Sequence, residues 1–168
     1  MLTAHEELLR QSMALGERAA TWSDVPIGAL VLDRSEAIIA RGYNTRERDA
    51  NPVGHAEINA LQAAALARGS WNLSGCTLVV NLEPCTMCAG AIVNSRISRV
   101  IFGAWDEKAG AAGSVRDVLR DPRLPHTVEV IGGVLEQQAH EQLQEWFGQL
   151  RRSGQLACGK QCISVDEP

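Results

Sequence analysis

Two short motifs, His55–Glu57 and Pro84–Cys88, constrain this sequence more than any other feature. Two cysteines at the spacing Cys-x-x-Cys can bind one metal ion together, and a histidine elsewhere in the chain can supply a third ligand. Structural zinc is enclosed by four protein ligands, whereas catalytic zinc keeps one position open for water or substrate. His55, Cys85 and Cys88 therefore predict an open, catalytic site that binds one Zn²⁺ per chain.

Glu57 follows the histidine by two residues, close enough to act on a metal-bound water without being a ligand itself. We expect both motifs at helix N-termini, in helices at residues 55–68 and 85–94. Pro84 suits a helix entry, where its missing N–H would have no partner. The positive end of the helix dipole favours the thiolate form of cysteine. Because positions i and i+3 share one helix face, both cysteines can reach the same ion.

Each of these residues also has a purely structural interpretation. The two cysteines can be a structural or redox pair, His55 an ordinary residue at a helix start, and Glu57 a solvated carboxylate of the first turn. A structural zinc would need a fourth Cys or His close by, and the sequence near the motifs contains none. The joint occurrence of the motif residues at this spacing favours the metal site.

The order of the predicted elements indicates an α/β fold. Strands are expected at residues 27–32, 37–41, 76–81, 99–103 and 127–131, and further helices at residues 4–20, 114–119 and 136–152. The first two strands form a hairpin, and strands then alternate with helices, which predicts helices on both faces of a five-stranded mixed sheet. In the helix at 55–68, Ile58, Leu61, Ala65 and Leu66 are expected on the inner side. One domain is predicted over residues 1–152, followed by a tail at 153–168 without predicted structure.

Composition limits the class of protein. The 168 residues, 45% of them apolar, fit one globular domain. The start lacks the features of a signal peptide, and no apolar run approaches the ~20 residues that cross a membrane, so we expect a cytoplasmic protein without a membrane partner. Its thiols should then be reduced, with Cys76 in the core and Cys158 and Cys162 as tail thiols without a function.

The charge balance argues mildly against a nucleic-acid partner. The net charge is −4 and the pI about 5.6, whereas nucleic-acid binders usually carry a basic surface. Residues 96–123 nevertheless contain six basic and four acidic side chains, which allows a local basic rim.

The segments around the motifs narrow the interpretation. They are Val25–Ala29, Gly42–Asn44, Asn81–Ala91, Ser95–Ile97, Phe102–Ala104 and Ala109–Ser114. With these segments the sequence, over residues 5–152, resembles the bacterial tRNA-specific adenosine deaminases of the cytidine/deoxycytidylate deaminase superfamily. The resemblance implies a cytidine-deaminase-like three-layer α-β-α sandwich and a homodimer. It also implies zinc-dependent conversion of adenosine to inosine at the wobble position of a tRNA anticodon stem-loop.

The same resemblance implies roles for individual residues. Glu57 would carry a proton from the zinc-bound water to the adenine ring. Asn44 would hydrogen-bond the flipped adenosine, and Ala56 and Pro84 would offer only backbone groups to the base. Asp106 would contact the RNA next to the target. Asn44 as a turn cap and Asp106 as a loop cap are the structural alternatives.

Trp105 departs from the polar residue expected beside Asp106, and it either packs or stacks on a neighbouring base. Arginines at 116, 120, 151 and 152 are either phosphate contacts or solvated surface residues.

Two other functions remain open from the sequence. A deaminase of free guanine, cytosine or cytidine would use the same metal chemistry and agree with the acidic pI. A non-catalytic, zinc-stabilised binding module would leave Glu57 idle. The loop at 109–114 and the last helix, which resemble the tRNA-specific branch, favour an RNA substrate.

Overall fold

A mixed five-stranded sheet forms the centre of the molecule. The computed structural model describes residues 3–153. The strands are β1 (Gly28–Leu32), β2 (Ile38–Tyr43), β3 (Thr77–Leu82), β4 (Arg99–Ala104) and β5 (Glu129–Ile131), in the order β2-β1-β3-β4-β5. β1 pairs antiparallel with both β2 and β3, whereas β3–β4 and β4–β5 are parallel. The predicted strands agree with these bounds to within two residues.

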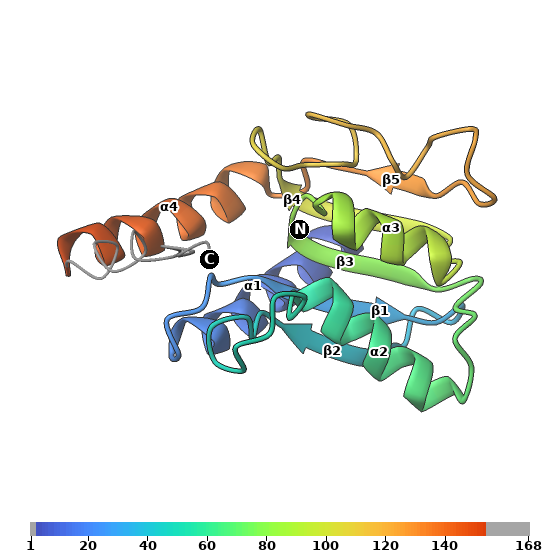
Figure 1. Ribbon diagram of the computed structural model, residues 1–168, viewed down its shortest axis with the longest axis horizontal. Coiled ribbons are helices and arrows are strands. Elements are labelled where there is room, and N and C mark those ends of the chain that lie inside the picture. The colour runs from blue at the N-terminus through green and yellow to red at the C-terminus, as the bar shows by residue number, and fades with distance from the viewer. Residues whose placement is uncertain (1–2, 154–168) are drawn as a thin grey trace, which may run out of the picture.

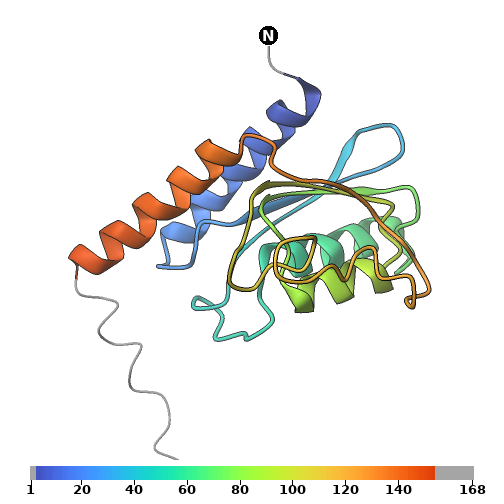
Figure 2. The same ribbon diagram turned by 90° about the horizontal axis from the view of Figure 1, so that it is seen from above.

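Helices cover both faces of the sheet. They are α1 (Ala4–Ala20), α2 (Ala56–Arg68), α3 (Thr86–Asn94) and α4 (Glu136–Arg152). The pair α2 and α3 lies on one face, and α1 and α4 lie side by side on the other (Figures 1 and 2). The predicted three-layer α-β-α sandwich is confirmed.

Side chains of the buried strands point alternately to the two faces of the sheet, and each face packs against its own pair of helices. In β3, Leu78 and Val80 pack with α2 and α3, whereas Val79 points to the opposite face and packs with Leu9 of α1. Successive side chains of a strand point to opposite faces, so a strand between two helical layers must be apolar throughout. This explains why every residue of β1 is buried.

Gly42 allows α2 to approach the sheet closely. A Cβ at this position would lie 2.4 Å from the carbonyl oxygen of Ala56 and 2.4 Å from the amide nitrogen of Ala60. Only a residue without a side chain fits there, and the N-terminus of α2 is thereby held directly against β2.

The predicted helix at residues 114–119 is wrong. The segment is a folded loop, with a bridge between Ala112 and Asp117. Val118 N, which would donate to the carbonyl oxygen of Ser114 in a helix, donates to the carbonyl oxygen of Ala111 at 2.9 Å instead. The loop with this bond is held by the carboxylate of Glu83, which accepts hydrogen bonds from Ala112 N and Ser114 N. A long-range acceptor therefore overrides the local preference.

The predicted inner side of α2 is also partly wrong. The buried residues of this helix are Ala56, Glu57, Ala60, Leu61 and Ala64. Leu66 is 84% exposed, and Ile58 and Ala65 are only half-buried. The helix is apolar on more than one side, so its periodicity did not identify the side that faces the sheet.

Other predictions have mixed outcomes. Cys76 is buried in the core as expected. Cys158 and Cys162 lie outside the described residues, and the division into a domain and a tail stays a prediction. Within residues 3–153, no helix combines the length and the apolar character needed to cross a bilayer.

Candidate metal centre

Two helix N-termini bring the three predicted ligands together. His55 is the N-cap residue of α2, and Cys85 is the N-cap residue of α3, with Cys88 one turn further along. The side chains of His55 and Cys85 make no capping hydrogen bond. They face each other instead, with His55 Nδ1 3.7 Å from Cys85 Sγ and 3.4 Å from Cys88 Sγ.

These separations fit a tetrahedral zinc ion. Zn–N and Zn–S bonds of roughly 2.0 and 2.3 Å at a tetrahedral angle place nitrogen and sulfur ligands about 3.5 Å apart. All three ligand atoms lie within 4.8 Å of one another, and no fourth His, Cys, Asp or Glu of residues 3–153 joins the cluster. The donor set therefore suits an open zinc site.

Hydrogen bonds among the three side chains shift their pKa values. The pKa of the Cys85 thiol is lowered to about 4, mainly by a hydrogen bond from the Cys88 thiol and to a smaller extent by one from His55. The same partnership and burial raise the pKa of Cys88, which keeps its proton at neutral pH. The Cys85 contact raises the pKa of His55 against the opposing effect of burial. Metal binding must displace the Cys88 proton.

Glu57 lies behind the ligands, in the first turn of α2. Its side chain is buried, and burial raises the pKa of its carboxyl group above the usual value. It interacts electrostatically with His55 and Cys85 and hydrogen-bonds with the Cys88 thiol. A buried carboxyl group with a raised pKa, next to the predicted metal ligands, is suited to accept and return a proton.

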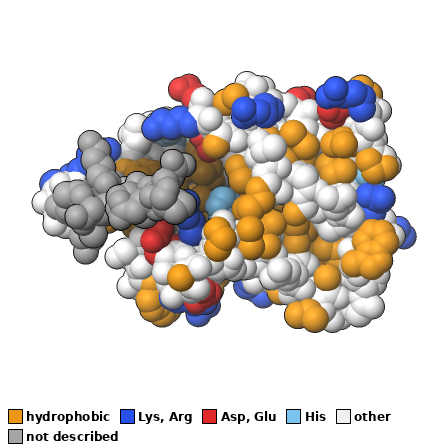
Figure 3. Space-filling view, viewed as in Figure 1, with side chains coloured by type: hydrophobic (Ala, Val, Ile, Leu, Met, Phe, Trp, Pro, Cys, Tyr) orange, Lys and Arg blue, Asp and Glu red, His pale blue; other side chains and the backbone are white. Residues whose placement is uncertain are grey.

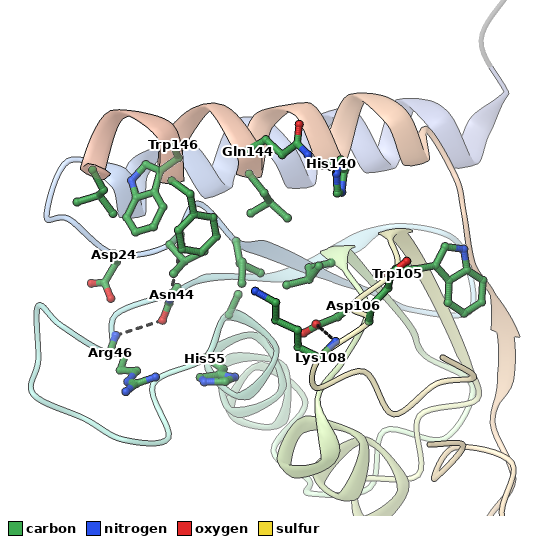
Figure 4. Close-up of a pocket in the computed structure, with 18 of the residues that line it drawn as sticks. Asp24, Asn44, Arg46, His55, Trp105, Asp106, Lys108, His140, Gln144 and Trp146 are labelled. Atoms are coloured by element: carbon green, nitrogen blue, oxygen red, sulfur yellow. Dashed lines mark hydrogen bonds between the residues drawn. The ribbon is translucent and has the colours of Figure 1, made fainter. Parts of the chain in front are cut away.

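A large cleft borders the metal centre at His55, whereas Glu57, Cys85 and Cys88 do not line it. Its volume is about 1520 Å³, which exceeds the roughly 300–1,000 Å³ typical of a small-molecule site. Figure 4 shows α4 along one side of this cleft, with His55, Asp106 and Lys108 on the other. The cleft therefore has room for more than one nucleotide.

Of the predicted substrate contacts, Asn44, Ala56 and Asp106 line the cleft, whereas Pro84 does not. Asn44 also caps a turn, because its Oδ1 accepts a hydrogen bond from Arg46 N at 3.2 Å. Asp106 Oδ1 accepts hydrogen bonds from Lys108 N and Ala109 N, which caps its loop. The structural alternatives for both residues are therefore present in the fold, alongside their position in the cleft.

Trp105 packs and stays accessible at once. Its ring meets Phe102 edge-on, with centroids 4.7 Å apart, and the residue is 37% exposed and lines the cleft. Arg120, in contrast, pairs with Asp117 at 2.8 Å and does not line the cleft.

Several lining residues were not singled out as site residues from the sequence. They are Asp24, Arg46, Lys108, His140, Gln144, Trp146 and Phe147. The helical spacing of the α4 residues is a detectable signal, but it predicts an apolar face without showing that this face borders a cleft.

Comparison with known proteins identifies the family. Residues 2–104 match the cytidine and deoxycytidylate deaminase zinc-binding region. The chain belongs to the cytidine and deoxycytidylate deaminase family. The matched segment contains His55, Cys85 and Cys88, so the zinc of this family and the ligand cluster of the structure agree.

The similarity to individual members of this deaminase family extends over nearly the whole chain. The chain is 40% identical over 156 residues to a tRNA-specific adenosine deaminase of Bacillus subtilis, covering 93% of this chain and 96% of the relative. It is similar to a solved structure from a study of A-to-I editing by tRNA:A34 deaminases, with a TM-score of 0.78 and 35% identity over 82% of this chain and 99% of the other. A guanine deaminase of Nitrosomonas europaea shares the fold, with a TM-score of 0.77 at 24% identity over 88% and 87% of the two chains.

Zinc binding by this deaminase-family chain should depend on Cys88 and on pH. The purified protein should contain one zinc per chain, and Cys88→Ala should contain less than about a tenth of that, since three ligands are the minimum of an open site. The Cys88 proton must leave, so apparent affinity should rise about tenfold per pH unit for each proton displaced. Metal analysis and chelator competition at two pH values measure both effects.

Cys76→Ala is the matched control, because Cys76 is a buried cysteine outside the ligand cluster. Full zinc content in Cys88→Ala, or zinc loss in the control, would contradict the assigned ligand set.

Proposed function

We propose that this chain hydrolyses adenosine to inosine at the wobble position of a tRNA anticodon, releasing ammonia. The observation that carries the proposal is the similarity, over nearly the full length of both chains, to a tRNA-specific adenosine deaminase. The size of the cleft supports it, because a free base would fill only a small part of the space at the metal centre.

Deamination of a free base is the second candidate, and the fold shared with guanine deaminase is its support. It is not favoured, because that likeness is weaker in sequence than the likeness to the tRNA-specific enzyme. A binding module without catalysis is not favoured either, because Glu57 is buried against the metal ligands and not exposed as a surface carboxylate.

The chemistry follows from the positions of the side chains. When bound by His55, Cys85 and Cys88, zinc lowers the pKa of a coordinated water toward neutrality and so supplies a nucleophile. In the proposed reaction Glu57 would accept a proton from the attacking water and deliver it to N1 of the adenine, while the water oxygen bonds to C6. Glu57 would then take the proton of the new C6 hydroxyl and pass it to the amino group, which leaves as ammonia as the C6 carbonyl forms.

The cleft walls would orient the RNA. Asn44 would hydrogen-bond the flipped adenosine, and Ala56 and Pro84 would contribute backbone groups. Asp106 would contact the neighbouring nucleotide. Unstacked RNA bases are commonly held on aromatic rings, and Phe147, 38% exposed in the cleft, offers such a surface.

Substrate choice tests the function directly. Zinc-loaded protein incubated with an anticodon stem-loop carrying adenosine at the wobble position should form inosine. It should release no ammonia from free adenosine, guanine, cytosine or cytidine, because these make few contacts in so large a cleft. Faster ammonia release from a free base would support the second candidate, and stem-loop binding without ammonia release would support the third.

Glu57→Gln should keep zinc and lose at least about a hundredfold in turnover, because general acid–base catalysis contributes roughly 10²–10⁴-fold. Inosine formation on the stem-loop and zinc content are the two measurements. Glu7→Gln, on the exposed side of α1, is the matched control and should behave as the unmodified protein. Nearly full turnover in Glu57→Gln would remove this residue from the mechanism.

A homodimer is part of the proposal, and α2 and α3 supply a suitable surface. They flank an apolar hollow of about 410 Å³, lined by Ile58, Leu61, Gln62, Ala65, Trp71, Ala91, Asn94 and Ser95. Trp71 is 65% exposed beside it, and Figure 3 shows hydrophobic side chains gathered over this face. Exposed apolar surface of this kind is typical of protein–protein contacts.

Ile58→Glu should convert the proposed dimer to a monomer, because it places a charge in the lining of the apolar hollow. Sedimentation velocity of both proteins measures the change. Val115→Glu adds the same charge at another exposed apolar residue, 46% exposed, and should stay dimeric. A dimer that survives Ile58→Glu would move the interface away from α2 and α3.

We expect the enzyme to work in the cytoplasm, where thiols stay reduced and the two cysteine ligands remain available for zinc.

A further inference from the structure

Glu83 is a buried carboxylate that the proposed reaction does not use. It lies between the end of β3 and Pro84, two residues before the ligand Cys85, and is 2% exposed. In the described part of the chain no Lys or Arg side chain forms an ion pair with it. A buried charge without an ion partner needs strong hydrogen bonds in compensation.

Three backbone N–H groups of one loop supply that compensation. Asp106 N donates to Glu83 Oε2 at 3.0 Å. Ala112 N and Ser114 N donate to Glu83 Oε1 at 2.9 and 3.1 Å. Hydrogen bonds to an ionised acceptor are stronger than neutral ones, so this single side chain determines where both ends of the loop lie.

Further contacts close the loop around the carboxylate. Ala111 N donates to the carbonyl oxygen of Pro84 at 2.9 Å. Ser114 Oγ donates to the carbonyl oxygen of Asp106 at 2.9 Å. A Cβ on Gly110 would lie 2.2 Å from Glu83 Oε2, so only glycine allows the loop to pass this close.

The loop held in this way forms one rim of the cleft. Trp105, Asp106, Glu107 and Lys108 line it, and Figure 4 shows Asp106 and Lys108 on the side of the cleft opposite α4, as His55 is. Glu57, in contrast, belongs to α2 and has no contact with this loop among its interaction partners. A shift of the loop would therefore change the binding of the RNA and leave the proton transfer in place.

We infer that Glu83 is a positioning residue that couples the cysteine-bearing turn to the rim at 105–114 and so determines how tightly the RNA around the target adenosine is bound. The inference rests on the proposed function. It assigns Glu83 to RNA recognition, acting through the loop, and not to metal binding or to proton transfer.

Glu83→Gln tests the inference with little change of shape. Its amide group would turn an N–H donor toward a loop N–H, so at least one of the three bonds is lost. The KM for the wobble-adenosine stem-loop should rise at least about tenfold, the low end of what a hydrogen bond to a charged group contributes to an equilibrium. The kcat should change less than about threefold, and zinc content should stay at one per chain, because Glu57 and the ligands keep their places.

A second measurement is independent of activity. Amide hydrogen exchange should show faster exchange for residues 106–114 in Glu83→Gln than in the unmodified protein, with α2 unchanged. If the unmodified protein fails to deaminate the stem-loop, the proposed function is wrong, and the exchange data still test whether Glu83 holds the loop.

Asp33→Asn is the matched control. Asp33 accepts hydrogen bonds from the backbone of Ser35 and Ala37 in the hairpin turn, which does not line the cleft. The same chemical change there should leave KM, kcat and exchange of the rim unchanged.

Gly110→Ala disturbs the contact between the loop and Glu83 by a change in the loop. It serves as the test variant if Glu83→Gln does not fold. Its methyl group would displace the loop from Glu83 and should produce the same rise in KM. Zinc loss, a fall in kcat at constant KM, an unchanged KM in both variants, or unchanged exchange in the rim would each overturn the inference.

Discussion

The site depends on one topological constraint, the meeting of three strand ends at one edge of the sheet. β1 is antiparallel to both β2 and β3, so β2 and β3 run in the same direction, and β4 runs parallel to β3. The carboxyl ends of all three strands therefore lie together, where α/β proteins commonly bind ligands. The chain leaves β2 toward His55, β3 toward Cys85 and β4 toward Asp106. Two helices start at this edge, and their first residues bring His55, Cys85 and Cys88 together.

Buried carboxylates hold the two loops that border the cleft. Glu83 accepts three N–H groups of the loop after β4, and Asp24, 1% exposed, accepts N–H groups of Glu47 and Arg48 in the loop after β2. A carboxylate out of water is stable only when its oxygens are satisfied, so each loop has one favoured position. The rims are thus arranged by the protein chain itself, independently of the metal.

Two helices present apolar side chains that the core does not use. On α4, Phe147 is exposed in the cleft, and on α2, Leu66 and Ile58 face away from the sheet. Both helices therefore expose apolar surface to water, which is unfavourable unless a partner covers it. RNA in the cleft and a second copy of the chain on α2 and α3 are the partners proposed for these two surfaces.

The amino-acid sequence was sufficient to predict the ligand cluster and most of the elements. A metal site requires particular ligand types at particular spacings, so His55, Cys85 and Cys88 were identifiable without coordinates, and apolar strand periodicity located all five strands. Only long-range packing shows which side of α2 faces the sheet, that residues 114–119 form no helix, and which N–H groups donate to Glu83. In each case the deciding partner lies far away in the sequence, such as the N–H of Ser114 for Glu83, and local patterns contain no information about contacts of that range.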